Sequence, residues 1–465
     1  MKGQFFLFIN VAVLPLILII GGFTPISIFL FWLSSFIISI YYFKPIMKQC
    51  GAVFLLSPCI ITYFYSILNY LTGSLYYCTN FLCLTRLYEE FFNIKHVRLF
   101  FILAFLNICN SLVAYIGAKH RVPLTSESLH KKAPFNVLGI FILLLFFSLL
   151  HVFIFDLSVI GGSAKGSQLT ETGTGMNYPF ILGIVVLLVH KLNTYRTPLL
   201  LHIVLLTVII LVMAVDSVGS KRELFFIIIS ILIIELIFHD KRIRLSLRNF
   251  LSVCLIGFVS VFYILSASIA RGYGSLGTDD ITESIYLVSE YAGNDAFNEM
   301  VGNNFETPYH YATAVISCDY TLTKKTPVLL GETFIKVLFI PIPRSIYKPR
   351  KMIDVFTTAY DAQKRMEGVS YPVSVYSELF ANFHVFSIFF LYVLFLVFQK
   401  IYIRMVRNAR MYSSFYIYWV PTSALFLQFV RGSGLESLII YSILACSSIF
   451  VGKLLIGDWG GEINN

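Results

Sequence analysis

The amino-acid sequence predicts an all-α, polytopic integral membrane protein. Of its 465 residues, 57% are hydrophobic and only 13% are charged, whereas a soluble domain carries about 25% charged residues. The mean hydropathy of +0.79 points the same way. Long apolar runs recur along the chain, and a helix needs about 20 such residues to cross a bilayer. Each run must be helical, because hydrocarbon offers no partner for free backbone groups.

The apolar runs predict about twelve transmembrane helices. The first run is too long for the apolar core of a signal peptide and lacks a small-x-small cleavage site, so we interpret it as a spanning helix. Two short runs, 178–192 and 224–239, are expected to tilt or to extend by a turn. The predicted spans are 4–22, 24–43, 51–72, 98–118, 135–157, 178–192, 198–215, 224–239, 250–270, 379–399, 413–430 and 435–456.

The distribution of basic residues predicts the orientation of the chain. With the N-terminus in the cytoplasm, eighteen Lys and Arg residues fall on inside segments and seven on short outside segments. This bias follows the positive-inside rule and places both termini in the cytoplasm. The net charge of +10 would suggest a nucleic-acid partner in a soluble protein. Here topology explains the charge, so no nucleic-acid partner is expected.

The chain is predicted to have three parts: 1–270 with nine helices, one large loop at 271–378, and 379–465 with three helices and a cytoplasmic tail. The loop lies outside the cytoplasm in this topology and is too long to be a bare connection. Its charge is segregated, with seven acids and one base from Arg271 to Glu306, then seven bases and one acid from Lys324 to Lys351. The spans themselves carry few charges. Asp156 and Asp216 stand near outer ends and Glu235 near an inner end, which argues against an ion-coupled transporter.

Basic residues gather on the outer side of the predicted topology. Arginine binds phosphate through its planar fork and lysine supplies a point charge, so a converging set would suit a lipid-linked diphosphate. The alternative is that these residues contact lipid headgroups or pair with loop acids. Prolines from Pro341 to Pro349 would hold Arg344 and Lys348 in fixed directions. The set comprises Lys221, Arg222, Arg271, Arg344, Lys348, Arg350, Lys351 and Arg431.

Glu378 and Asn382 stand four residues apart where the chain re-enters the membrane. On a helix they share one face, and a half-desolvated carboxylate there could act as a general base for a sugar hydroxyl. The alternative is a carboxylate at a helix start, stabilised by the helix dipole. His310 and His384 are other candidates for the base, although lone histidines are more often packing residues. Neither the cysteines nor the histidines have metal-site spacing, so no metal or cofactor is expected.

These features together resemble the bacterial O-antigen and capsule repeat-unit polymerases, the Wzy family. The string Pro343-Arg344-Ser345-Ile346-Tyr347-Lys348-Pro349 is similar to a Pro-Arg…Lys-Pro string late in that family's large loop. Glu378 and Asn382 resemble its E-x-x-x-N-F-G segment, except that His384 replaces the glycine. Gly219–Arg222, Arg271 and Arg431 also match basic positions of the family, but the R-x10-G pair of some members is absent from this sequence.

The resemblance implies a metal-independent glycosyltransferase that uses no cofactor. It would move a glycan from undecaprenyl diphosphate onto an acceptor repeat unit on the same lipid, at the periplasmic face of the bacterial inner membrane. Glu378, Arg344 and Arg271 would be catalytic, and a chain-length regulator and a flippase would be partners. The alternatives are a lipid-linked oligosaccharide flippase and an O-antigen ligase. Residues that would bind the diphosphate or the sugar are Lys221, Arg222, Lys348, Arg431, Asn382 and Tyr347.

Overall fold

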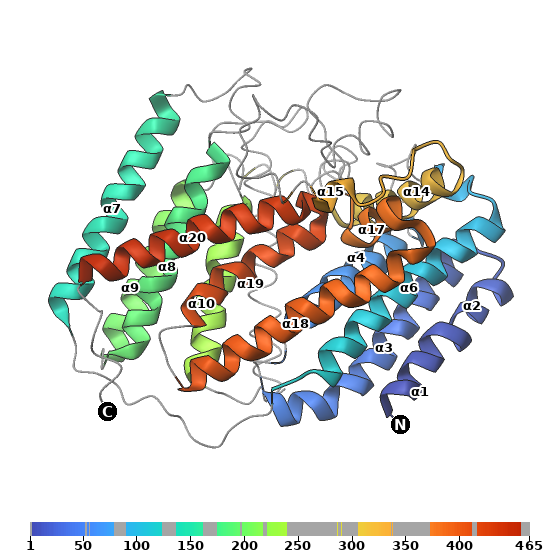
Figure 1. The fold of residues 1–465 in the computed structure, drawn as a ribbon, viewed down its shortest axis with the longest axis horizontal. Coiled ribbons are helices and arrows are strands. Elements are labelled where there is room, and N and C mark those ends of the chain that lie inside the picture. The colour runs from blue at the N-terminus through green and yellow to red at the C-terminus, as the bar shows by residue number, and fades with distance from the viewer. Residues whose placement is uncertain are drawn as a thin grey trace.

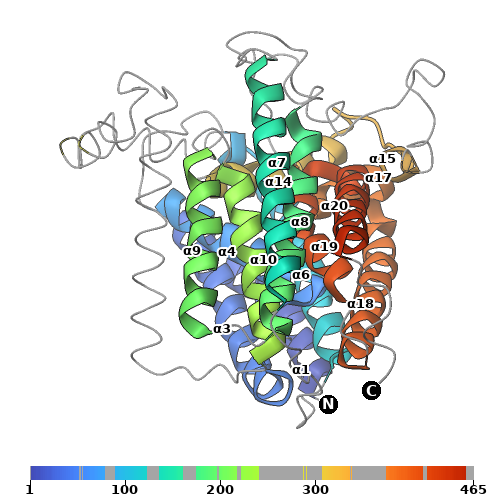
Figure 2. The same ribbon diagram turned by 90° about the vertical axis from the view of Figure 1, so that its left-hand side faces the viewer.

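A computed structural model describes the fold of most of the chain. Every element in the described residues is a helix (Figures 1 and 2). The described residues are 2–51, 54, 56–78, 90–122, 136–160, 174–195, 198–216, 221–239, 286, 290, 306–335, 337, 373–411 and 416–456.

The long helices run side by side as one bundle with two ends. In Figure 1, α14, α15 and α17 gather at the upper end, whereas α1 begins and α3, α6, α10 and α18 end at the lower end. The α-helices are α1 (Lys2–Phe8), α2 (Pro15–Ile20), α3 (Pro25–Cys50), α4 (Pro58–Cys78), α6 (His96–Lys119), α7 (Val137–Ile160), α8 (Thr174–Thr194), α9 (Leu199–Asp216), α10 (Lys221–His239), α14 (Glu306–Leu322), α15 (Glu332–Ile335), α17 (Val375–Phe383), α18 (Ser387–Met411), α19 (Trp419–Gln428) and α20 (Gly434–Ile456). Short π or 3₁₀ turns are η1 (Ile9–Val13), η7 (His384–Phe386), η8 (Tyr416–Tyr418) and η9 (Phe429–Ser433).

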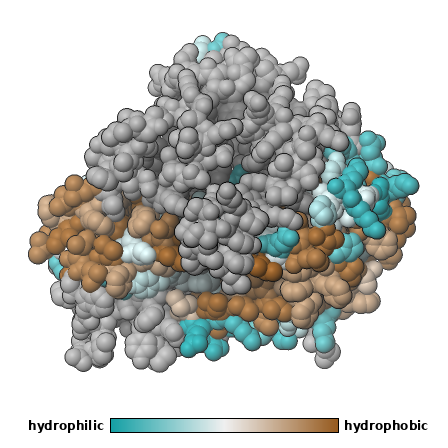
Figure 3. All heavy atoms as spheres, turned by 45° about the horizontal axis from the view of Figure 1, so that its top comes forward, coloured by the Kyte–Doolittle hydropathy of each residue, from teal (hydrophilic) through white to brown (hydrophobic). Residues whose placement is uncertain are grey.

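Five described helical segments are long and apolar enough to cross a membrane. Many of their large apolar side chains face outward, such as Phe8, Ile20 and Phe101, and brown apolar atoms cover both flanks of the bundle in Figure 3. An exposed apolar surface of this extent is typical of contact with lipid. The all-α membrane class is therefore confirmed. The five segments are Gly3–Ile20, Pro25–Cys50, His96–Lys119, Val375–Arg407 and Gly434–Ile456.

The count of about twelve transmembrane helices stays a prediction. The described apolar parts of α7, α8, α9 and α10 are shorter than a full span. The predicted span 250–270 lies outside the described residues, as does much of the predicted loop 271–378.

Helix α14 belongs to the predicted outside loop, yet it packs into the core at the upper end of the bundle. Its Tyr311 is completely buried, and the indole N–H of Trp32 on α3 donates a hydrogen bond to the Tyr311 hydroxyl at 3.0 Å. The Tyr311 ring also packs against Tyr70 on α4, with centroids 5.5 Å apart. A Cβ added to Gly73 of α4 would lie 2.6 Å from the Tyr311 Cβ, so the two helices pack closely there. The loop therefore contributes a helix to the bundle core.

The predicted span 379–399 is divided into two helices in the structure. α17 begins earlier, at Val375, where the Ser374 hydroxyl caps it by accepting a hydrogen bond from the Ser377 N–H at 3.3 Å. α17 ends at Phe383 because His384 has a φ of +49°, which lies outside the helical region and favours glycine. α18 starts after this turn. Glu378 and Asn382 thus sit on a short helix of their own.

Candidate functional site

The structure brings three of the predicted site residues to the upper end of the bundle: Glu378, Asn382 and Arg431. Glu378 and Asn382 lie on α17, and Arg431 lies in the π turn η9, which packs against α17. Lys221 and Arg222 form the start of α10, and the roles of their side chains stay predictions. Arg271, Arg344, Tyr347 and Lys348 lie outside the described residues.

The Glu378 carboxylate is held inside the protein by a small hydrogen-bond network. The side chain is buried, at 3% exposure, and its Oε1 accepts a hydrogen bond from the Thr333 hydroxyl at 2.8 Å. The Asn382 amide donates to the same hydroxyl oxygen and to the Glu378 carbonyl oxygen, each at 2.8 Å. We call Glu378, Thr333 and Asn382 the Glu378 network. It fixes the orientation of a carboxylate that has been removed from bulk water.

The position of Glu378 on its helix favours the charged carboxylate. Glu378 stands in the first turn of α17, where the positive end of the helix dipole stabilises a negative group. Burial acts in the opposite direction, because it disfavours the charged form. The helix-start interpretation and the general-base interpretation therefore describe the same geometry: a desolvated carboxylate supported by a helix N-terminus and a hydroxyl donor.

Arg431 is placed beside α17 by the glycine that follows it. Gly432 has a φ of +116°, and a Cβ there would overlap the backbone carbonyl oxygen of Val373, the residue before the Ser374 cap. Only glycine fits a backbone conformation and an approach of this kind. The close packing fixes the Arg431 backbone next to the start of α17.

His310, on α14, belongs to the same neighbourhood. Its Nε2 lies 3.1 Å from the Tyr65 hydroxyl of α4. Burial lowers the pKa of His310 to about 3, and the nearby positive charge of Arg431 acts in the same direction. The imidazole is therefore neutral at physiological pH. A base with so low a pKa is weak, which argues against His310 as the group that abstracts a proton. His384, the other candidate histidine, lies against the Phe380 ring with centroids 4.9 Å apart.

An ion pair that the sequence did not reveal ties α14 to α6. Arg98 Nη1 lies 2.9 Å from Asp319 Oδ1. Burial raises the pKa of Asp319, whereas the positive charges of Arg98 and Lys325 lower it. The only sequence signal was an acidic residue within a largely apolar helix. Thr333 gave no signal, because its partners lie 45 and 49 residues away along the chain.

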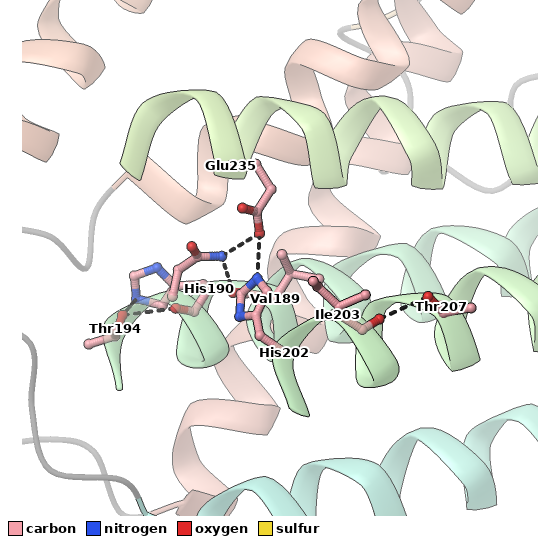
Figure 4. Close-up of polar contacts among 8 residues, drawn as sticks. Val189, His190, Thr194, His202, Ile203, Thr207 and Glu235 are labelled. Carbon is pink, nitrogen blue, oxygen red and sulfur yellow. Dashed lines mark hydrogen bonds and ion pairs between the residues drawn. The ribbon is translucent and has the colours of Figure 1, made fainter. Parts of the chain in front are cut away.

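A second polar network lies between α8, α9 and α10 (Figure 4), toward the lower end of the bundle in Figure 1. Glu235 Oε1 accepts a hydrogen bond from the Asn193 amide at 2.7 Å and lies 3.0 Å from His202 Nε2. We call these three residues the Glu235 network. The sequence placed Glu235 near an inner helix end but did not predict its partners. One polar group from each of three helices meets here inside an apolar bundle.

The described part of the chain holds no candidate metal site. Among those residues, no group of three His, Cys, Asp or Glu side chains lies close enough to hold a metal ion. In comparisons with known proteins, no family model, no curated protein and no solved structure matches this chain.

Proposed function

We propose that this protein is a metal-independent glycosyltransferase that polymerises undecaprenyl-diphosphate-linked oligosaccharide repeat units at the outer face of the bacterial inner membrane. The observation that carries the proposal is the grouping of a buried carboxylate, Glu378, with the cation Arg431 at one end of an apolar helix bundle. Glu378 and Arg431 are also among the residues on which the resemblance to repeat-unit polymerases rests, together with the Pro343–Pro349 string. Their grouping across separate parts of the chain supports the view that they act together.

The positions of the described basic residues support an outward-facing upper end. Lys44 and Lys48 lie near the end of α3, Lys119 ends α6, and Arg404 and Arg407 lie toward the end of α18. All three helices end at the lower end of the bundle (Figure 1). By the positive-inside rule this end is cytoplasmic. The Glu378 network is then on the outer side, where lipid-linked repeat units would be joined. We extend the topology to about twelve spans with both termini inside.

The proposed reaction transfers the glycan from its diphosphate carrier to a sugar hydroxyl. Glu378 takes the proton of the acceptor hydroxyl as its oxygen attacks the anomeric carbon of the donor. The bond between that carbon and the diphosphate oxygen breaks, and undecaprenyl diphosphate leaves with the electron pair. Arg431 stabilises the charge that develops on the diphosphate, a role that we also assign to Arg222, Arg271 and Arg344. Asn382 and Thr333 orient the carboxylate.

Glycan laddering in the native bacterium tests the proposal. The gene is deleted and then complemented with wild type, Arg344→Ala, Arg431→Ala or the control Lys44→Ala, an exposed lysine at the other end of the bundle. We expect deletion to remove long chains while single repeat units stay attached to the lipid core. Wild type and Lys44→Ala should restore the ladder, and the two arginine variants should not, at equal membrane levels.

Two results would contradict this function. An unchanged ladder after deletion, in a strain with no second polymerase gene, would rule out the proposed polymerase function. Loss of the single-unit band as well would point to a flippase or a ligase, because both act before the first unit appears on the core.

One observation favours the flippase as a second candidate. A transporter needs polar groups along its path, and the Glu235 network places a carboxylate, an imidazole and an amide between three helices. Under that alternative, Glu235→Gln would block the appearance of every glycan band. Under the polymerase proposal, it leaves the ladder intact.

A further inference from the structure

A basic pocket lies at the lower end of the bundle, on the opposite side from the Glu378 network. Its volume is about 380 Å³, and it is lined by His120, which follows α6, and by Lys400, Ile403, Arg404 and Arg407 of α18. The proposed reaction uses none of these residues, and Arg404 and Arg407 serve above only as evidence for the orientation of the bundle. The pocket is large enough for a phosphate group and part of a small headgroup.

The packing of α6 against α18 builds the pocket. Gln399, buried on α18, donates a hydrogen bond from its side-chain amide to the His120 carbonyl oxygen at 2.6 Å. This bond holds the end of α6 beside the basic face of α18. Lys400, Arg404 and Arg407 are spaced so that they lie on one face of the helix. The pocket therefore lies at the surface where the residue after α6 packs against α18, and its Lys400, Arg404 and Arg407 side chains are exposed.

Positive charge converges on this pocket. Burial lowers the pKa of His120, and the charges of Lys119 and Lys400 lower it further. Lys400, Arg404 and Arg407 supply this positive charge, whereas the lowered pKa of His120 favours its neutral form. Like charges held this close repel each other, and an anion placed between them relieves that repulsion. Arginine pairs of this kind suit phosphate, because each planar fork can donate two hydrogen bonds.

An apolar stripe leads along α18 into the pocket. Phe390, Val393 and Val397 are 39%, 41% and 50% exposed, respectively, and their spacing continues directly to Lys400, Arg404 and Arg407 on the same helix face. A stripe that is apolar within the bilayer and basic at its end matches an acyl chain joined to a phosphate headgroup. The positive-inside rule alone requires no such arrangement. Lys44 and Lys48 of α3 fulfil that rule as exposed residues that do not line the pocket.

We propose that this pocket binds the phosphate group of an anionic phospholipid of the inner leaflet, with an acyl chain along Phe390, Val393 and Val397. Arg404 and Arg407 bind the phosphate oxygens, Lys400 adds a third positive charge, and His120 completes the lining. Such a lipid would hold α18 at a fixed depth in the membrane. This helix follows α17, which carries Glu378.

Lipid retention by the full-length protein tests this proposal. The purified protein in detergent is titrated with phosphatidylglycerol or with phosphatidylcholine, and bound lipid is counted by native mass spectrometry. The variant Arg404→Gln/Arg407→Gln removes two pocket charges. The control Lys44→Gln/Lys48→Gln removes two exposed charges at the same end of the bundle. Each basic residue near a membrane surface contributes about fivefold to binding of an anionic lipid. We expect a loss of roughly tenfold or more for the pocket variant and wild-type retention for the control.

A charge-preserving variant and a second ligand distinguish a bound lipid from a general charge effect and from a soluble phosphate. Arg404→Lys/Arg407→Lys keeps the charge and should retain part of the phosphatidylglycerol binding, which also shows that the pocket tolerates substitution. Equal retention of phosphatidylglycerol by wild type and the glutamine variant would overturn the proposal. So would an equal loss in the Lys44→Gln/Lys48→Gln control, because it would reveal a general charge effect. Pocket-dependent binding of inorganic phosphate without pocket-dependent lipid binding would overturn it in favour of a soluble phosphate ligand.

Discussion

The two ends of the bundle each hold a glutamate in a polar network, but the partners differ. At the upper end, the Glu378 carboxylate is 3% exposed and accepts a hydrogen bond from a threonine hydroxyl. At the lower end, the Glu235 side chain is 23% exposed and lies 3.0 Å from a histidine nitrogen. The Glu378 carboxylate is oriented by the neutral groups of Thr333 and Asn382 on the short helices α15 and α17. The Glu235 carboxylate instead pairs with the titratable His202 between three long helices (Figure 4).

Under the proposed function, this difference corresponds to a chemical role for Glu378 and a structural role for Glu235. A general base must accept a proton, and a hydroxyl donor orients it without supplying a full opposing charge. A carboxylate beside a histidine can form an ion pair that holds helices together. Glu378 also has a cation, Arg431, in the neighbouring turn η9, which suits the proposed diphosphate chemistry. We therefore assign chemistry to the upper end and helix association to the Glu235 network.

The largest expected effect contrasts the two glutamates directly. Glu378→Gln keeps the shape of the side chain and an acceptor for Thr333 but removes the base, so polymer formation should fall by about 100-fold or more. Glu235→Gln should leave it within about twofold of wild type. Transfer to a labelled acceptor by purified protein measures both. Glu332→Gln, an exposed neighbour of Thr333, is the control. Equal losses at positions 378 and 235 would erase the distinction between the two ends.

Alanine substitutions of two glycines, Gly432 at the upper end and Gly117 near the end of α6, compare how closely the two ends of the bundle are packed. Alanine at position 432 would meet the backbone of Val373 at a positive φ, so Gly432→Ala should destabilise the protein by about 3 kcal/mol or more and also lower activity. Alanine at Gly117 on α6 would meet the tip of the Ile60 side chain at 2.8 Å and the Cys59 Cβ at 3.0 Å. The Ile60 tip can move and no backbone atom is overlapped, so this change should cost less, about 1–2 kcal/mol. Thermal unfolding in detergent measures both. A larger loss of stability for Gly117→Ala than for Gly432→Ala would show that η9 is not closely packed against Val373.

His310 should make the stability of the upper end depend on pH. Its pKa is about 3 in the folded protein and about 6.5 in an unfolded chain. Between these values the unfolded state binds a proton that the folded state does not, so stability falls as the pH drops below about 6.5. From pH 7.5 to pH 5 wild type should lose about 2 kcal/mol more than His310→Gln. Parallel pH profiles of the two proteins would show that His310 is not buried in neutral form.

The smallest effect concerns the turn between α17 and α18. His384 has a φ of +49° and a ψ of −122°, and such a sparsely populated backbone conformation costs a non-glycine residue about 1–3 kcal/mol. His384→Gly should therefore stabilise the protein by about 0.5–1 kcal/mol without loss of polymer formation. Chemical unfolding compared with wild type measures the change. A destabilised variant would mean that the contact between His384 and Phe380 outweighs the backbone term.

Local patterns in the sequence predicted the features that depend on one helix. Glu378 and Asn382 share a helix face because they are four residues apart, and the Asn382 amide does reach the Glu378 carbonyl oxygen. Lys400, Arg404 and Arg407 counted only among the eighteen inside Lys and Arg residues, and the face they share on α18 was not singled out from the sequence. The break at His384 was missed, because histidine gives little sign of a positive φ. The sequence resemblance had marked that position only as a departure from glycine.

The sequence by itself determined the membrane class, the helical character of the apolar runs and the charge bias between the two sides, because hydrocarbon forces every backbone group into a helix. The tertiary structure alone decided which distant side chains meet. Thr333 reaches Glu378 across 45 residues, and Trp32 reaches Tyr311 across 279. His120 joins the basic stripe of α18 only because α6 and α18 pack together. Contacts of this kind depend on helix packing, which no local pattern specifies.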